Sequence, residues 1–171
     1  MTDILCEGRH MLFLRAGHWE YVEHRVAKEA AMIVAVTEDR LLVLAEEFRP
    51  PIGRPVVSLP TGLVGDEGAE DASNAARREL REETGYTADA FVPIGRGPGS
   101  AGQSSEMILF FLASPARLAG EQAAHDRGRI RVHAVPLARL REWTAGRESE
   151  GAAIDPKIWA GLWMAGVAEI R

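Results

Sequence analysis

The order of strand-like and helix-like segments is the feature that most constrains the fold of this 171-residue chain. Short runs rich in Val, Ile and Leu recur along its length, and only a few helical patterns interrupt them. We expect strands or hairpins at 9–25, 30–48, 55–62, 88–95, 107–113 and 130–135, and helices at 71–84, 137–146 and 156–170. Because these elements do not follow strict βαβ alternation, they predict an α/β fold with a mixed sheet covered by helices on both faces.

Turn and cap signals mark the ends of several expected elements. Ala16-Gly17 divides the apolar and aromatic segment 9–25, and Glu38-Asp39 divides the segment 30–48. Both patterns predict β-hairpins. Gly85 stands where a glycine commonly ends a helix, so the helix before it should stop there.

The composition excludes several classes of protein. The chain has 46% hydrophobic and 26% charged residues with a net charge of −5, which disfavours a nucleic-acid binder because no basic stripe is present. The single cysteine, Cys6, cannot form an internal disulfide, and this suits a reducing cytosol. The first residues do not resemble a signal peptide, and no apolar run reaches the length of a membrane span. We therefore expect one globular domain in the cytoplasm without a membrane partner.

The segment RRELREETGY at 77–86 groups three acids on one side of the predicted helix: Glu79, Glu82 and Glu83. At about 100° per residue, these side chains fall within an arc of roughly 100°. Like charges at this spacing repel by a few tenths of a kcal/mol per exposed pair. Grouped carboxylate oxygens suit a hard cation such as Mg²⁺ or Mn²⁺. The alternative is a solvated surface helix in which Arg78 pairs with Glu82.

The segment from Gly62, GLVGDEGAEDASNAARRELREETGY, resembles the Nudix box. That motif reads glycine, five residues, glutamate, seven residues, then R-E-U-x-E-E-x-G-U, where U is a bulky apolar residue. The part from Glu70 to Tyr86 matches in full, accepting tyrosine as the last bulky residue, while the loop after Gly62 carries two extra residues. Surface loops can lengthen without disturbing the elements they join, so we interpret the insertion as a loop variation.

The resemblance extends over most of the chain and is to the ADP-ribose pyrophosphatase branch. The matching segments are EEFRPPIGRPVVSLPTGLVGDE (46–67), SAGQSSE (100–106), IRVHAVPL (130–137) and IDPKIWAGLWMA (154–165). Three positions depart from the branch: Ser58 replaces a frequent glutamate, Thr61 an alanine and Ala101 a proline. The resemblance implies a Nudix α/β/α sandwich at 28–171, preceded by an N-terminal β-hairpin region at 1–27 that dimerises.

The resemblance also implies a chemistry. Nudix enzymes hydrolyse a diphosphate that links a nucleoside to another moiety, and this branch implies ADP-ribose as the substrate, giving AMP and ribose 5-phosphate. Mg²⁺ is the expected cofactor, with Mn²⁺ possible. The implied metal ligands are Glu79, Glu82, Glu83 and the carbonyl of Thr61. Arg78 would orient these acids, and Glu70 would have a structural role near the helix start.

The expected general base lies outside the box. In this branch it is an acid on a loop, and Glu106 is the candidate because it follows the glycine- and serine-rich segment GPGSAGQSS. Such a loop could act as a mobile lid. The competing base is Glu82 or Glu83, and Asp126 and Glu121 are weaker candidates.

Substrate recognition is expected from the N-terminal strands and from Arg49. By the resemblance, Trp19 would stack on adenine and Glu20 would lie near its exocyclic amine. Arg49 offers planar, bidentate donors to the pyrophosphate or to adenine. The alternatives are a dimer-interface role for Trp19 and a salt bridge from Arg49 to Glu46 or Glu47.

Assembly and substrate identity leave further alternatives. The N-terminal hairpin has little chain of its own to cover its aromatic residues, so we expect a homodimer in which each site borrows residues from the other chain. GDP-mannose, NADH and dinucleoside polyphosphates are the alternative substrates. A non-catalytic Nudix-fold sensor of nucleotide sugars is the alternative to an enzyme, but the box is intact.

Overall fold

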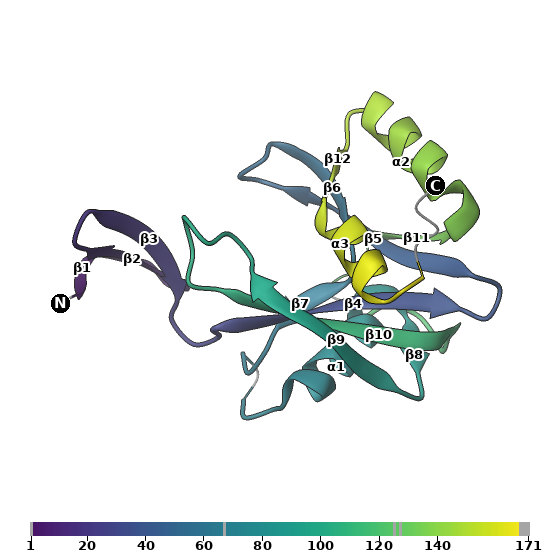
Figure 1. The fold of residues 1–171 in the computed structure, drawn as a ribbon, viewed down its shortest axis with the longest axis horizontal. Helices are drawn as coiled ribbons and strands as arrows, with labels where there is room; N and C mark the ends of the chain where they lie inside the picture. Colours follow the sequence, from purple (N-terminus) through teal and green to yellow (C-terminus); the bar gives the residue numbers. More distant parts are fainter. Residues whose placement is uncertain (1, 67, 125, 127, 168–171) are drawn as a thin grey trace.

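The computed structural model describes residues 2–66, 68–124, 126 and 128–167 (Figure 1). A three-stranded antiparallel sheet at the N-terminus contains β1 (Thr2–Glu7), β2 (Met11–Ala16) and β3 (Trp19–His24). The remaining strands within the described residues form one larger sheet: β4 (Glu29–Thr37), β5 (Leu41–Arg49), β6 (Arg54–Ser58), β7 (Thr61–Leu63), β8 (Tyr86–Ala88), β9 (Phe91–Pro98), β10 (Met107–Leu118), β11 (Ile130–Pro136) and β12 (Ala153–Ile154). The helices are α1 (Ala72–Thr84), the 3₁₀ turn η1 (Leu137–Arg139), α2 (Leu140–Ser149) and α3 (Lys157–Met164).

The larger sheet is mixed, as the sequence predicts. Its path runs β12-β6-β5-β4-β10-β8, while β11 pairs with β5, β7 with β4 and β9 with β10. The pairs β10–β4 and β12–β6 are parallel, and the other pairs are antiparallel. Strand β4 lies at the centre, because it pairs with β10 along one edge and with β5 and β7 along the other.

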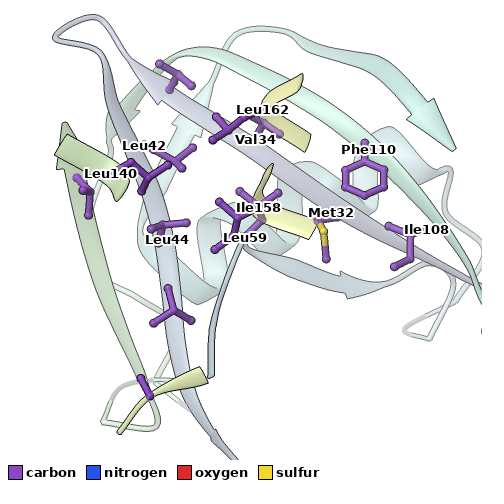
Figure 2. Packing of buried hydrophobic residues seen from close by; sticks show 14 residues of the cluster. Met32, Val34, Leu42, Leu44, Leu59, Ile108, Phe110, Leu140, Ile158 and Leu162 are labelled. Atoms are coloured by element: carbon purple, nitrogen blue, oxygen red, sulfur yellow. The ribbon is translucent and has the colours of Figure 1, made fainter. Parts of the chain in front are cut away.

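Two apolar layers cover the two faces of this sheet. Alternate residues of a strand point to opposite faces, and β4 follows this rule. Met32, Val34 and Val36 pack with α2 and α3 through residues such as Ile158 and Leu162 (Figure 2). The intervening residues Ala31, Ile33 and Ala35 pack on the other face against Ala75, Ala76 and Leu80 of α1. The predicted α/β/α sandwich is therefore confirmed (Figure 1).

Helix α1 begins and ends where its sequence signals predict. The Asp71 carboxylate accepts a hydrogen bond of 2.8 Å from the Asn74 N–H, which satisfies a free donor of the first turn. Gly85 adopts φ 77°, and its N–H donates to the Arg81 carbonyl at 2.9 Å. Glycine adopts this left-handed conformation without the steric cost that a Cβ adds.

Other elements differ from the sequence-based expectation. The predicted strand 55–62 is divided between β6, which pairs with β5, and β7, which pairs with β4. Pro60 lies between them and offers no N–H to a ladder. The predicted strand 88–95 is likewise two strands, β8 and β9, and β12 was not predicted.

Two differences concern the ends of the chain. The predicted N-terminal hairpin is present as β2 and β3, and the structure adds β1 at its edge. All six residues of β1 are exposed, so the sequence has no alternation of buried and exposed residues that would predict this strand. Helix α3 ends at Met164, before the predicted end at 170, and residues 168–171 lie outside the described part. None of the described helices is long and apolar enough to span a membrane.

Candidate active site

Glu79 of α1 is buried against the backbone of β7. A Cβ added to Gly62 would lie 1.8 Å from the Glu79 carboxylate carbon, so only a glycine lets the two segments approach this closely. Burial raises the pKa of Glu79 because it penalises the charged form, and the Arg78 guanidinium opposes this effect. The first glycine of the box thus positions one of its carboxylates.

Glu83 is held against the neighbouring residue of the same strand. The Thr61 N–H donates a hydrogen bond of 3.0 Å to the Glu83 carboxylate, and the Thr61 hydroxyl donates to the Leu59 carbonyl at 2.8 Å. Burial raises the pKa of Glu83 to about 8, although the Thr61 N–H opposes this rise. The nearby charges of Glu79 and Asp126 contribute to this rise. The structure thus brings Thr61 to the box acids through its N–H.

Arg78 holds the carboxylates of the helix and of the preceding loop together. Its guanidinium donates to Asp66 at 3.1 Å, Glu70 at 2.8 Å, Glu79 at 2.6 Å, Glu82 at 3.3 Å and the Leu63 carbonyl at 3.3 Å. The hydrogen bond to Glu70 is the main reason why the pKa of Arg78 is raised and that of Glu70 lowered. Arg78 therefore orients the acids, and its donors are directed at protein oxygens.

The donor chemistry of the box fits a hard divalent cation. Glu79, Glu82 and Glu83 offer carboxylate oxygens, which Mg²⁺ and Mn²⁺ prefer. Among the described residues, however, no three acidic, histidine or cysteine side chains converge into a ready-made metal site. The reason is visible in the contacts: Arg78 bridges Glu79 and Glu82, while Glu83 turns to Thr61.

A cleft of about 550 Å³ opens beside β7. Thr61 and Gly62 line it, so Glu79 and Glu83 contact its wall from behind. Arg49, at the end of β5, and Glu106, just before β10, also line it. The structure therefore places Arg49 and Glu106, which lie far apart in the sequence, in one cleft with Thr61 and Gly62, the residues that contact Glu83 and Glu79.

Glu106 lies in a close-packed position in this cleft. A Cβ added to Gly99 would lie 2.9 Å from a Glu106 carboxylate oxygen, so the carboxylate rests on the glycine backbone. The Glu106 N–H donates to the Ser104 hydroxyl at 3.0 Å, and its carbonyl accepts the Gly99 N–H at 3.0 Å. These contacts direct the side chain from the loop into the cleft.

The predicted adenine-recognition residues lie elsewhere in the chain. Trp19 and Glu20 belong to β3 of the N-terminal sheet and do not line the cleft. Trp19 is 54% exposed, with its ring 5.5 Å from that of His18. Arg49, which does line the cleft, forms an ion pair of 3.0 Å with Glu47, as its alternative interpretation predicts.

Sequence reasoning missed two residues of the cleft, Asp155 and Lys157 at the start of α3. Their side chains form an ion pair of 2.9 Å, and the Asp155 carboxylate also accepts the Lys157 N–H at 2.9 Å. The sequence predicts a helix that begins at 156, close to the observed start of α3. No local sequence pattern predicts that the start of α3 lies in the same cleft as Glu106. Its position depends on the pairing of β12 with β6, which are distant in the sequence.

Fold and site together are those of the Nudix class of hydrolases. The NUDIX domain model matches residues 27–153, and the chain belongs to this family. An ADP-ribose pyrophosphatase of Bacillus subtilis is 33% identical over 149 residues, covering 86% of this chain and 78% of that protein. A Nudix hydrolase of Schizosaccharomyces pombe is 30% identical over 152 residues, covering 82% of this chain and 73% of that protein.

A solved structure shares the fold. It is described as an ADP compounds hydrolase and superposes with a TM-score of 0.70 at 18% identity, covering 97% of this chain and 90% of that one. The predicted resemblance to the ADP-ribose pyrophosphatase branch is confirmed by these relatives. The division at residue 27 into an N-terminal region and a Nudix domain stays a prediction.

Proposed function

We propose that this protein hydrolyses the pyrophosphate bond of ADP-ribose to AMP and ribose 5-phosphate. The observation that carries the proposal is the contact of Glu79 and Glu83 with Gly62 and Thr61, which sets box carboxylates against the wall of the cleft. The relative from Bacillus subtilis, which this chain matches over most of both lengths, is named for the same activity.

The proposed cofactor is Mg²⁺, with Mn²⁺ as the alternative. Glu79, Glu82, Glu83 and the Thr61 carbonyl would hold it, and when bound it neutralises the charge of the diphosphate. Arg78 would orient the acids, because its guanidinium donates hydrogen bonds to Glu79 and Glu82 directly. A diphosphate is itself an anion, so an acidic site without cations would repel it.

Glu106 is the proposed general base. It removes a proton from the attacking water while the water oxygen forms a bond to phosphorus. The bond from that phosphorus to the bridging oxygen then breaks, and the bridging oxygen leaves with the other phosphate. The side chain lies in the cleft on the backbone of Gly99. Glu82 and Glu83 are the competing bases, but Arg78 and Thr61 already engage them.

Substrate recognition is proposed to need two chains. Trp19 and Glu20 lie on the N-terminal sheet outside the cleft of their own chain, so a cytoplasmic homodimer would bring them to the adenine in the partner's cleft. Arg49 would contact the pyrophosphate or adenine from within the cleft. Because a guanidinium can form bidentate bonds to phosphate, it would exchange Glu47 for the substrate.

A substrate screen tests the proposed activity. The purified protein with Mg²⁺ is incubated with ADP-ribose, GDP-mannose, NADH or a diadenosine polyphosphate, and released nucleoside monophosphate is measured. We expect the highest kcat/KM on ADP-ribose. A higher value on another compound would reassign the substrate, and binding of ADP-ribose without any turnover would favour the sensor.

A further inference from the structure

The outer edge of β3 pairs with the loop that carries Glu106. The Val22 N–H donates to the Gln103 carbonyl at 2.9 Å, and the Ser105 N–H donates to the Val22 carbonyl at 3.2 Å. Val22 and Ser104 form a parallel β-bridge, so the loop adds a short strand segment to the N-terminal sheet. In Figure 1, the loop between β9 and β10 extends from the body of the molecule to this sheet.

Side chains strengthen the same junction. The Ser105 hydroxyl donates to the Glu23 carboxylate at 3.2 Å, and the Lys28 ammonium binds the other oxygen of that carboxylate at 3.1 Å. Glu23 thus links the loop to the segment that joins the N-terminal sheet to β4. These contacts lie within one chain and need no partner subunit.

The junction continues directly to Glu106. The Ser104 hydroxyl accepts the Glu106 N–H at 3.0 Å, so the bridge residue also fixes the backbone of the proposed base. On the other side, the Met107 N–H donates to the Lys28 carbonyl at 3.1 Å and starts the pairing of β10 with β4. Glu106 is therefore held between two backbone anchors.

We infer that the N-terminal sheet positions Glu106 in its own chain, with Ser104 and Val22 as positioning residues. This inference rests on the proposed role of Glu106 as the base. Within the loop, the Ser100 carbonyl accepts the N–H groups of Gln103 and Ser104, each at 3.0 Å, and the bonds to Val22 fix this turn against the sheet. The sheet serves two sites: the catalytic loop of its own chain and, in the proposed dimer, the adenine of the partner.

Two substitutions separate positioning from general stability. Ser104→Ala removes the hydroxyl that accepts the Glu106 N–H, while Ser104→Thr retains a hydroxyl. Misplacing a catalytic group by about 1 Å can cost roughly a hundredfold in rate. We expect Ser104→Ala to lower kcat on ADP-ribose about tenfold or more with KM changed less than about twofold. Ser104→Thr should recover most of the rate, and Ser149→Ala, a matched change on α2, should leave kcat unchanged.

Val22→Pro tests the sheet itself. The N–H and carbonyl of Val22 both face the loop, so the hydrogen bonds between β2 and β3 do not use them. Proline removes the donor to Gln103 and places its ring against that carbonyl, so it separates the loop from β3 while the bonds between β2 and β3 remain. We expect Val22→Pro to lower kcat about tenfold in the wild-type background and to have no further effect in the Glu106→Gln background.

The possible outcomes are distinguishable. An equal loss from Val22→Pro in both backgrounds would show that it acts independently of Glu106 and would overturn the inference. The inference would also be overturned if Val22→Pro and Ser104→Ala kept wild-type kcat while Glu106→Gln was strongly impaired. A Glu106→Gln variant with the wild-type rate would instead remove the base assignment, and the positioning role with it, while the hydrolysis of ADP-ribose would stand. If Val22→Pro does not fold, the comparison of kcat between Ser104→Ala and Ser104→Thr still tests whether this junction positions Glu106.

Discussion

At the scale of single residues, the site depends on the missing side chain of Gly62. The Glu79 carboxylate occupies the space that a Cβ would fill, at 1.8 Å from its carboxylate carbon. We expect Gly62→Ala to displace Glu79 and to lower kcat about a hundredfold. Gly97→Ala is the matched control, because a Cβ there meets no atom within 4 Å, and it should retain wild-type kcat. Steady-state kinetics on ADP-ribose measure both, and an active Gly62→Ala variant would contradict the placement of Glu79.

Glu83 provides a second residue-scale prediction. Its burial makes the ionised carboxylate costly, as the raised pKa shows, and a glutamine of the same shape can still accept the Thr61 N–H. We expect Glu83→Gln to lower kcat by at least about a hundredfold, the scale of losing a major electrostatic group. In EDTA, at a pH above the Glu83 pKa of about 8, its melting temperature should equal or exceed that of the wild type, since a buried charge is then removed. Near-normal turnover of Glu83→Gln in saturating Mg²⁺ would exclude Glu83 from the metal site. We expect Glu82→Gln to lower kcat by a similar factor.

At the scale of elements, a buried carboxylate joins α2 to the sheet. Glu46 of β5 accepts two hydrogen bonds from one Arg147 nitrogen, at 2.7 and 2.8 Å, and lies 2.9 Å from the His133 ring. Burial alone would raise the pKa of Glu46, but the bonds from Arg147 and His133 outweigh it, and the pKa is lowered. A carboxyl with a lowered folded pKa stabilises the fold above its unfolded pKa, near 4.5, and loses this contribution as the pH falls through the lower value.

The lowered pKa of Glu46 gives a prediction for the pH dependence of stability. Glu46→Gln should lower the free energy of unfolding by about 3 kcal/mol at pH 7, because Arg147 loses its buried carboxylate partner and retains the exposed Glu150. The difference from the wild type should shrink as the pH falls below about 4.5, where Glu46 of the unfolded chain is already protonated. Urea unfolding at several pH values measures it. Glu142→Gln on the same helix breaks only the exposed pair with Arg139 and should leave the unfolding free energy unchanged. A pH-independent difference would mean that packing, not charge, explains the loss.

The elements also show what sequence patterns can and cannot predict. Helix α1 was predictable because Asp71 and Gly85 act within one turn of its ends. The pairing of Arg78 with Glu82 followed from their spacing, whereas its bonds to Asp66 and Glu70 depend on how the loop folds back. Strand β1 was missed because its residues are all exposed and carry no burial pattern.

At the scale of the whole molecule, the sequence could not show which distant segments meet. The family motif places the acids on one helix, but the cleft is completed by Lys157 from the last helix and by the loop before β10. The contact between that loop and β3 joins residues more than 80 positions apart, such as Glu23 and Ser105. No local propensity predicts such contacts, because they depend on the packing of complete elements.

The N-terminal sheet exposes apolar side chains on a small element that has no helix over it. The residues are Ile4 (55% exposed), Leu5 (38%), Met11 (39%), Phe13 (39%) and Trp19 (54%). Small sheets of this kind gain stability by packing apolar side chains against another element. Two copies of this sheet would supply that cover, and this supports the predicted homodimer.

The dimer and the shared site can be tested together by mixing two impaired variants. Stacking on an aromatic ring is worth about 1–3 kcal/mol, so Trp19→Ala should raise KM for ADP-ribose roughly ten- to a hundredfold with a smaller change in kcat. Glu106→Gln should lower kcat instead, by roughly two orders of magnitude, with little change in substrate affinity.

If Trp19 acts in the partner's cleft, each mixed dimer contains one site with both Trp19 and Glu106. At substrate well below KM, an exchanged equimolar mixture should then recover about a quarter of the wild-type rate. If the mixture shows only the average of the two variants, Trp19 acts within its own chain or not at all. A monomer by light scattering at micromolar concentration would exclude the shared site altogether.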